Sequence, residues 1–163
     1  LRRGLGWHTG RGLFREIGAG FAGYVAGLPL VAAGFLITIG LIVGFGFKPS
    51  HPIQEAARGS DPLGVVLLFS LAVVWAPVVE ETMFRGAMYH AMRRWTGAIV
   101  SAVVVAFLFA AIHPQGISTI PVLMSLAIVF ALIREWRGSL IGCVVAHALH
   151  NAMLVTLNVV LLS

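Results

Sequence analysis

The stretch VVWAPVVEETMFRGAMYH, residues 73–90, places three charged side chains inside a largely apolar segment. They belong to the adjacent glutamates Glu80 and Glu81 and to Arg85. A charge at the centre of a bilayer costs at least about 2.5 kcal/mol, and such residues usually face the interior of a helical bundle or a water-filled cavity. The segment therefore predicts a bundle of membrane helices that encloses a polar site.

The composition of the whole chain is that of a membrane protein. Of its 163 residues, 59% are hydrophobic and 10% are charged, whereas soluble domains are about 45–50% apolar and about 25% charged. The single cysteine, Cys143, excludes an intrachain disulfide, and we expect it to be a small buried residue. We treat residues 1–163 as a single membrane domain. Because the chain starts at Leu1 rather than at methionine, we expect it to be a fragment of a longer protein.

Five apolar runs approach the length of about 20 residues that a bilayer-spanning helix needs. The predicted fold class is therefore all-α, a polytopic transmembrane helical bundle with about five spans. The second span contains Pro77, where we expect a kink. The predicted spans are 17–47, 63–93, 97–113, 119–133 and 139–162.

The arginines mark alternate ends of these spans. Segments 1–16, 93–94 and 134–137 carry the arginine excess, and segments 48–61 and 113–118 do not. The positive-inside rule then places the arginine-bearing ends in the cytoplasm. The net charge of +5 is explained by this topology. No basic helix or aromatic-interleaved surface supports nucleic-acid binding, so the bilayer is the expected partner.

Three of the spans bring polar side chains to a similar depth. At 1.5 Å per residue, Glu80 and His113 lie roughly 20 and 24 Å from the arginine-bearing ends of their spans. His147 and Asn151 lie roughly 15 and 21 Å from theirs. The hydrocarbon core is about 30 Å thick. This coincidence predicts one intramembrane polar site, built from three helices.

The spacing of the charged residues in the second span separates their roles. Glu81 and Arg85 are four residues apart and lie on one helix face, so Arg85 can neutralise Glu81 through a charge-assisted hydrogen bond. Glu80 points about 100° away around the helix and can face a cavity alone. Burial disfavours the charged form of an unpaired carboxyl, which makes Glu80 a candidate general base.

Two further pairs have the same four-residue spacing. His147 and Asn151 can face one point, and Phe109 can form an apolar wall beside His113. Taken singly, each pair has a simpler interpretation: polarity at a helix end for His113, and an interhelical hydrogen bond for the pair on the last span. We interpret the adjacent His150 as a structural residue that bonds to the backbone or to a neighbouring helix.

These polar residues form three motifs on separate predicted spans. Together the motifs resemble those of the CPBP family of intramembrane proteases, which includes the type II CAAX prenyl endopeptidases and the bacterial Abi proteins. The resemblance covers about residues 63–151, and no motif position departs from it. In chain order the motifs are Glu80-Glu81-x-x-x-Arg85, Phe109-x-x-x-His113 and His147-x-x-x-Asn151.

The resemblance implies an intramembrane endopeptidase in which Glu80 is the base that activates water. Its substrate would be a membrane-associated peptide or protein, prenylated or not. We expect a multi-pass protein of the plasma membrane of a prokaryote. The implied catalytic residues are Glu80, His113, His147 and Asn151, with Glu81, Arg85 and Phe109 in support.

Two mechanisms are compatible with these residues. Glu80, His113 and His147 could hold zinc, with water as the fourth ligand, but a separate base would then be needed. Without metal, Glu80 deprotonates the water, while the histidines and Asn151 hold it and stabilise the oxyanion. We favour the metal-free mechanism, so no cofactor is expected, and zinc is the alternative.

Two other classes of function remain open from the residues alone. Membrane carboxylates and histidines also relay protons and bind ions in transporters, and Glu80 would then be needed for proton- or ion-coupled flux without hydrolysis. A catalytically inactive scaffold could keep the polar cluster for packing, in which case Glu80→Gln would destabilise the fold. The three motifs together favour the endopeptidase.

Overall fold

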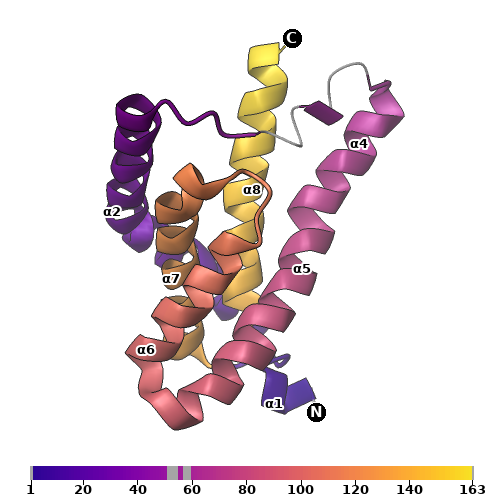
Figure 1. Ribbon diagram of the computed structural model, residues 1–163. Helices are drawn as coiled ribbons and strands as arrows, with labels where there is room; N and C mark the ends of the chain where they lie inside the picture. The colour runs from indigo at the N-terminus through magenta and orange to yellow at the C-terminus, as the bar shows by residue number, and fades with distance from the viewer. Residues whose placement is uncertain (1, 51–54, 57–59, 163) are drawn as a thin grey trace.

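The computed structural model describes residues 2–50, 55–56 and 60–162, and the regular structure of this part is helical (Figure 1). Segment 48–61, between the first two predicted spans, lies partly outside the described residues. The elements, including two π-helices (η1, η2) and one 3-10 helix (η3), are α1 (Arg2–Leu5), α2 (Leu13–Phe45), α4 (Pro62–Ser70), η1 (Leu71–Trp75), α5 (Ala76–Glu81), η2 (Thr82–Met88), α6 (Tyr89–Ala111), η3 (Ile117–Thr119), α7 (Ile120–Arg137) and α8 (Ile141–Leu162).

Among the described residues, the continuous apolar helical runs number about four rather than the predicted five. In the described part, three helical runs are long and apolar enough to cross a bilayer: Leu13–Phe45, Pro62–Ala111 and Ile117–Arg137. Ile141–Leu157 is a shorter apolar helix. The prediction of an all-α membrane bundle is confirmed, and the difference in number arises because two predicted spans, 63–93 and 97–113, lie within one run.

That run changes direction at a single residue. Gly97 has φ 78° and ψ 177°, and helical geometry continues on both sides of it. Only glycine adopts a positive φ readily, so the turn needs no loop. In Figure 1 the chain descends through α4 and α5, turns at the lower end of the molecule and returns as α6. The two arms therefore lie in one bundle as a hairpin.

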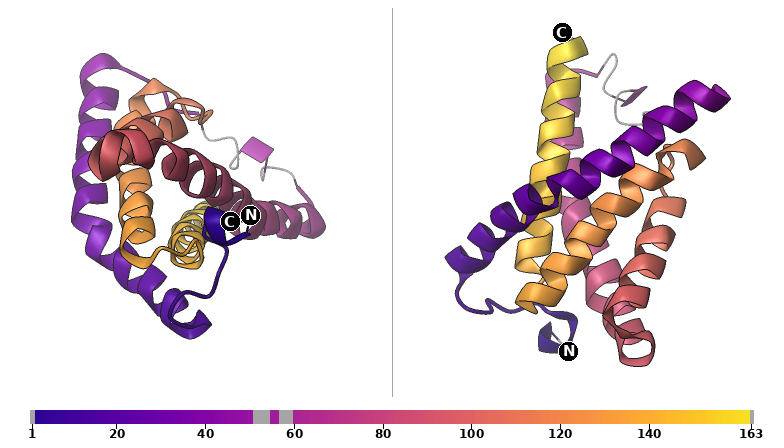
Figure 2. Two further views of the ribbon diagram at one scale, coloured as in Figure 1. Left: turned by 90° about the horizontal axis from the view of Figure 1, so that it is seen from below. Right: turned by 90° about the vertical axis from the view of Figure 1, so that its left-hand side faces the viewer.

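Helix α2 lies obliquely across α7 and α8 (Figure 2), and glycines let it approach closely. A Cβ atom at Gly20 would lie 2.6 Å from the carbonyl oxygen of Gly142, and one at Gly34 would lie 2.6 Å from the carbonyl oxygen of Pro121. Small residues allow such close contacts between helices in lipid, where van der Waals packing drives association. The glycines of α2 thus fasten it to the two helices behind it.

Helix α7 lies between two apolar clusters. On one side, Phe84, Val105 and Phe109 pack with alanines of α7. On the other side, Tyr24 and Cys143 pack against a second face of α7. Cys143 is fully buried, as the sequence predicts. The first cluster packs the η2–α6 segment on α7 and the second packs α8 on α7. Helix α8 also contacts η1 and α5 directly, which brings the polar residues of these elements together.

Candidate active site

The two adjacent glutamates lie in a helix whose turns are widened on both sides. Glu80 and Glu81 end the six-residue α5, which lies between the π-helices η1 and η2. Widened turns of this kind are rare and occur frequently at functional sites. Pro77, the second residue of α5, has no N–H to donate. The sequence predicts a kink at Pro77. The structure has the widened turn of η1 directly before α5.

Glu81 is the centre of a buried ion pair. Its Oε1 accepts hydrogen bonds from Nη1 of Arg85 at 3.0 Å and from Nδ1 of His147 at 2.9 Å. The side chains of Glu81 and Arg85 are 0% exposed, and that of His147 is 4% exposed. The carboxylate is thus neutralised within its own helix and at the same time fixes the imidazole of α8.

Arg85 also joins this pair to α7. Its Nη2 donates to the carbonyl oxygen of Ala127 at 2.8 Å. Its guanidinium carbon lies 4.8 Å from the ring centroid of Phe109 and 5.2 Å from that of Phe130. Desolvated cation–π contacts of this kind are favourable. The arginine is therefore held by its own helix, by α6 and by α7.

Glu80 is in a different environment from Glu81. Its Oε2 lies 3.9 Å from Nε2 of His113 and 3.8 Å from Nε2 of His147. This oxygen is buried and has no hydrogen-bond partner among the described residues, yet 29% of the side chain is exposed. The structure thus brings together Glu80, His113 and His147, which the sequence predicts at similar depths, and leaves Glu80 accessible.

The hydrogen bonds of the two histidines fix which nitrogens carry hydrogen. Nδ1 of His113 lies 2.5 Å from the carbonyl oxygen of Phe109, and because a carbonyl only accepts, this nitrogen must donate. Nδ1 of His147 donates likewise to the carboxylate of Glu81. In the neutral rings, both Nε2 atoms therefore present lone pairs towards Oε2 of Glu80. Three acceptors face one another without a donor between them.

Such a set of acceptors requires a hydrogen-bond donor or a cation between its members. The separations of 3.8 and 3.9 Å are too long for direct hydrogen bonds and suit a bridging water. A water there can donate one O–H to the carboxylate of Glu80 and the other to an imidazole. The arrangement can therefore hold and polarise a water molecule.

Aromatic rings close the site on its other side. The ring of Phe109 lies 4.3 Å from that of His113 and 6.0 Å from that of His147, measured between centroids. The ring of Phe130 is stacked on His147 at 4.9 Å. These buried rings restrict rotation of both imidazoles. The sequence predicts the role of Phe109, but Phe130 has no spacing signal that sets it apart from other apolar residues of its span.

Oε2 of Glu80 and the Nε2 atoms of His113 and His147 form what we call the acceptor set. The structure does not bring Asn151 into it. Its Nδ2 donates to the carbonyl oxygen of Ala72 in η1 at 2.8 Å, and among the described residues it makes no hydrogen bond with Glu80 or the two site histidines. The widened turn of η1 supplies this carbonyl. Asn151 therefore connects α8 to the helix that carries Glu80, a contact that side-chain motifs cannot predict because its partner is a backbone atom.

His150 lies on the α2 side of α8, away from the acceptor set. Its Nδ1 is 3.0 Å from the hydroxyl oxygen of Tyr24, and the two rings meet edge to face at 5.9 Å. The contact joins α8 to α2, which agrees with the structural role predicted for His150. The sequence contained no signal for Tyr24 as its partner.

Oε2 of Glu80 and the Nε2 atoms of His113 and His147 have the chemistry that zinc requires of its ligands. Each histidine offers Nε2 while its Nδ1 is bound to a carboxylate or a carbonyl, an arrangement typical of zinc ligands. Tetrahedral ligands about 2.0–2.2 Å from zinc lie about 3.3 Å apart, so Glu80 would have to move inwards by roughly half an ångström. In the described part, no three His, Cys, Asp or Glu side chains already have metal-binding geometry.

Comparison with known families identifies one match. The model of the Rce1-like type II CAAX prenyl endopeptidase family matches residues 62–153, more than half of the chain. The matched segment runs from the start of α4 into α8 and contains every residue of the site. It confirms the resemblance drawn from the three motifs. The comparisons with curated proteins and with solved structures give no match.

Proposed function

Since the chain belongs to the Rce1-like family of type II CAAX prenyl endopeptidases, we propose that it hydrolyses a peptide bond with a water activated by Glu80. Family membership implies a CAAX-type intramembrane endopeptidase. The observation that carries the finer proposal is the contrast between the two glutamates. Glu81 is fully buried in an ion pair, whereas Glu80 is accessible and faces two imidazole nitrogens at 3.8 and 3.9 Å.

The reaction begins with a water between Oε2 of Glu80 and an Nε2 atom of His113 or His147. The carboxylate accepts a proton as the water oxygen attacks the substrate carbonyl. The C–O bond forms and the carbonyl electrons move to its oxygen, which becomes an oxyanion. If the other imidazole enters the step as the cation, protonated on both nitrogens, its Nε2–H donates to the oxyanion and stays on the ring. Glu80 then passes its proton to the leaving amine as the C–N bond breaks.

The other polar residues position Glu80 and the two imidazoles. Glu81 holds Nδ1 of His147, and the Phe109 carbonyl holds Nδ1 of His113. Asn151 keeps the Glu80 helix against α8 through the Ala72 carbonyl. Fixed donors and acceptors need no reorganisation during the reaction, which is the main source of electrostatic catalysis.

Zinc is the alternative for the same residues. Glu80, His113 and His147 would hold the ion, which would act as a Lewis acid and generate a hydroxide nucleophile. Glu81 would then orient His147 without acting as a base, because it is committed to Arg85. The substrate in either case is a membrane-embedded peptide segment, with or without a prenyl group.

The test is cleavage of fluorogenic peptides, prenylated and unprenylated, by purified protein in detergent. We compare wild type, Glu80→Gln and the control Glu55→Gln, which changes an exposed glutamate outside the site. We expect cleavage by wild type and the control, none by Glu80→Gln, and no effect of a strong chelator.

Other results would change the mechanism or the function. Loss of cleavage on chelation and recovery with zinc would make the three residues metal ligands. Absence of cleavage by folded wild type, together with Glu80-dependent flux in proteoliposomes, would establish a transporter. If Glu80→Gln unfolds the protein while wild type is inert in both assays, the cluster is a packing device.

A further inference from the structure

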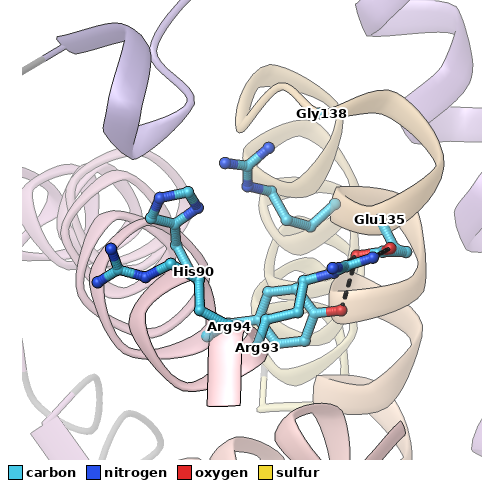
Figure 3. A pocket seen from close by; sticks show the side chains of 7 residues that line it. His90, Arg93, Arg94, Glu135 and Gly138 are labelled. Carbon is cyan, nitrogen blue, oxygen red and sulfur yellow. Dashed lines mark hydrogen bonds and ion pairs between the residues drawn. The ribbon is translucent and has the colours of Figure 1, made fainter. Parts of the chain in front are cut away.

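A second polar site lies at the arginine-bearing end of the bundle. A cavity of about 340 Å³ lies between the first turns of α6 and the last turn of α7, and Figure 3 shows the side chains that line it. The site lies about ten residues along the helix from Glu80, or about 15 Å at 1.5 Å per residue, so it is distinct from the acceptor set. The residues that line it include His90, Arg93, Arg94, Arg134, Glu135 and Gly138.

One of the three arginines in this cavity already has a partner. Arg93 forms a two-pronged ion pair with Glu135, in which Nε lies 2.7 Å from Oε2. The hydroxyl of Tyr89 donates to the same oxygen at 2.9 Å. The only carboxylate that lines the described cavity is thus occupied. Arg94 and Arg134 have no acidic partner among the described residues, and the cavity carries an excess of positive charge.

Arg134 is the residue that marks this cavity as a built site. Its side chain has no hydrogen bond to any described residue, its Nε is fully buried, and the residue is only 9% exposed. A Cβ atom at Gly6 would lie 2.7 Å from Nη2 of Arg134, so the glycine makes room for the guanidinium. An unpaired buried charge is costly, and an anion in the cavity would pair with it.

The depth of the cavity indicates which anion it meets. Trp95 and Trp136, each next to a residue that lines the cavity, are 87% and 57% exposed. Exposed tryptophans of membrane proteins gather at the level of the lipid headgroups. The positive-inside rule places this end at the cytoplasmic leaflet, where anionic lipids lie. We propose that the cavity binds the phosphate of an anionic phospholipid headgroup through Arg134 and Arg94.

The test uses the full chain in detergent, with phosphatidylglycerol titrated in and lipid-bound protein counted by native mass spectrometry. Arg94→Gln changes an exposed side chain and should raise the Kd about five-fold. Arg134→Gln removes the buried guanidinium and should raise it about ten-fold or more. The control Arg15→Gln removes an exposed arginine at the same end of the bundle, outside the cavity, and should leave the Kd within about two-fold.

Three results would overturn the proposal. If Arg15→Gln and Arg94→Gln weaken lipid binding equally, the binding reflects general attraction between a basic surface and an acidic lipid. Unchanged affinity in Arg94→Gln and in folded Arg134→Gln would show that lipid binds elsewhere. If inorganic phosphate or glycerol phosphate displaces the lipid at equal concentration, the cavity is a site for soluble phosphate. Weaker lipid binding in Arg94→Gln and Arg134→Gln alone, without displacement of the lipid by soluble phosphate, establishes the headgroup site.

Discussion

Two arginine–glutamate pairs lie in this bundle in opposite environments. The Arg85–Glu81 pair in the middle of the bundle is 0% exposed on both sides, whereas the Arg93–Glu135 pair at its end is 46% and 35% exposed. Exposed pairs contribute at most about 1 kcal/mol. Removing one partner of a buried pair costs about 3–5 kcal/mol, because the charge that remains is neither paired nor solvated. The same kind of ion pair therefore contributes much to stability in the middle of the bundle and little at its end.

The largest expected effect separates Glu80 from the buried pair beside it. Glu80→Gln removes the proposed base but no hydrogen bond present in the structure, so peptide cleavage should fall by about 10²–10⁴-fold while stability stays unchanged. Initial rates and unfolding by SDS in mixed micelles measure the two quantities on one preparation. A parallel fall in both would mean that Glu80 belongs to the structural group.

The next effect concerns Arg85→Met, which leaves Glu81 charged, buried and short of a partner. The free energy of unfolding should fall by about 3–5 kcal/mol, measured by the same SDS titration. The double variant Glu81→Gln/Arg85→Met removes the orphaned charge and should recover part of the loss. A double variant less stable than Arg85→Met would contradict the idea that the unpaired carboxylate is the cause.

A smaller effect is expected for Asn151→Ala. The substitution leaves the Ala72 carbonyl of η1 without its donor, which costs about 1–3 kcal/mol. Because the contact aligns the Glu80 helix with α8, kcat should fall more than KM rises. A variant with normal stability and sharply reduced kcat would show instead that the Asn151 amide contacts the reacting atoms.

The smallest effect is expected at the exposed pair. Arg93→Gln should change the free energy of unfolding by about 1 kcal/mol or less, and raised salt should reduce the difference further, since solvent ions screen exposed charges. Unfolding titrations of wild type and variant at low and high ionic strength measure this. A loss comparable to that of Arg85→Met would overturn the comparison between the two regions.

Sequence patterns predicted the helical membrane fold and the residues that meet at the site because both depend on side-chain chemistry and helical spacing. Glu81 and Arg85 needed only a separation of four residues, and Glu80 and His113 only a similar depth. The widened turns of η1 and η2 were not predictable, because they depend on how the backbone adjusts to tertiary packing. The carbonyl partner of Asn151 follows from those turns and was hidden for the same reason.

The structure differs from the prediction in how the second and third spans are connected, for another physical reason. In the predicted topology the second span ended at Arg93 and the third began at residue 97. Helical geometry instead continues through Arg93 and Arg94, and the reversal occurs at Gly97 alone. Sequence reasoning also interpreted Arg134 only as a topology marker. Its burial against Gly6 depends on contacts between residues more than a hundred positions apart.

The ion pair of Arg85 and Glu81 has a consequence for biosynthesis, because both partners lie on one helix. Chains emerge from the ribosome N-terminus first, so the segment from Pro62 to Ala111 reaches the membrane before His147 is made. Two isolated charges would resist partition into lipid at that stage. Paired across one helical turn, they cancel before any neighbouring helix arrives, and the hairpin can enter the bilayer with Glu80 already in place.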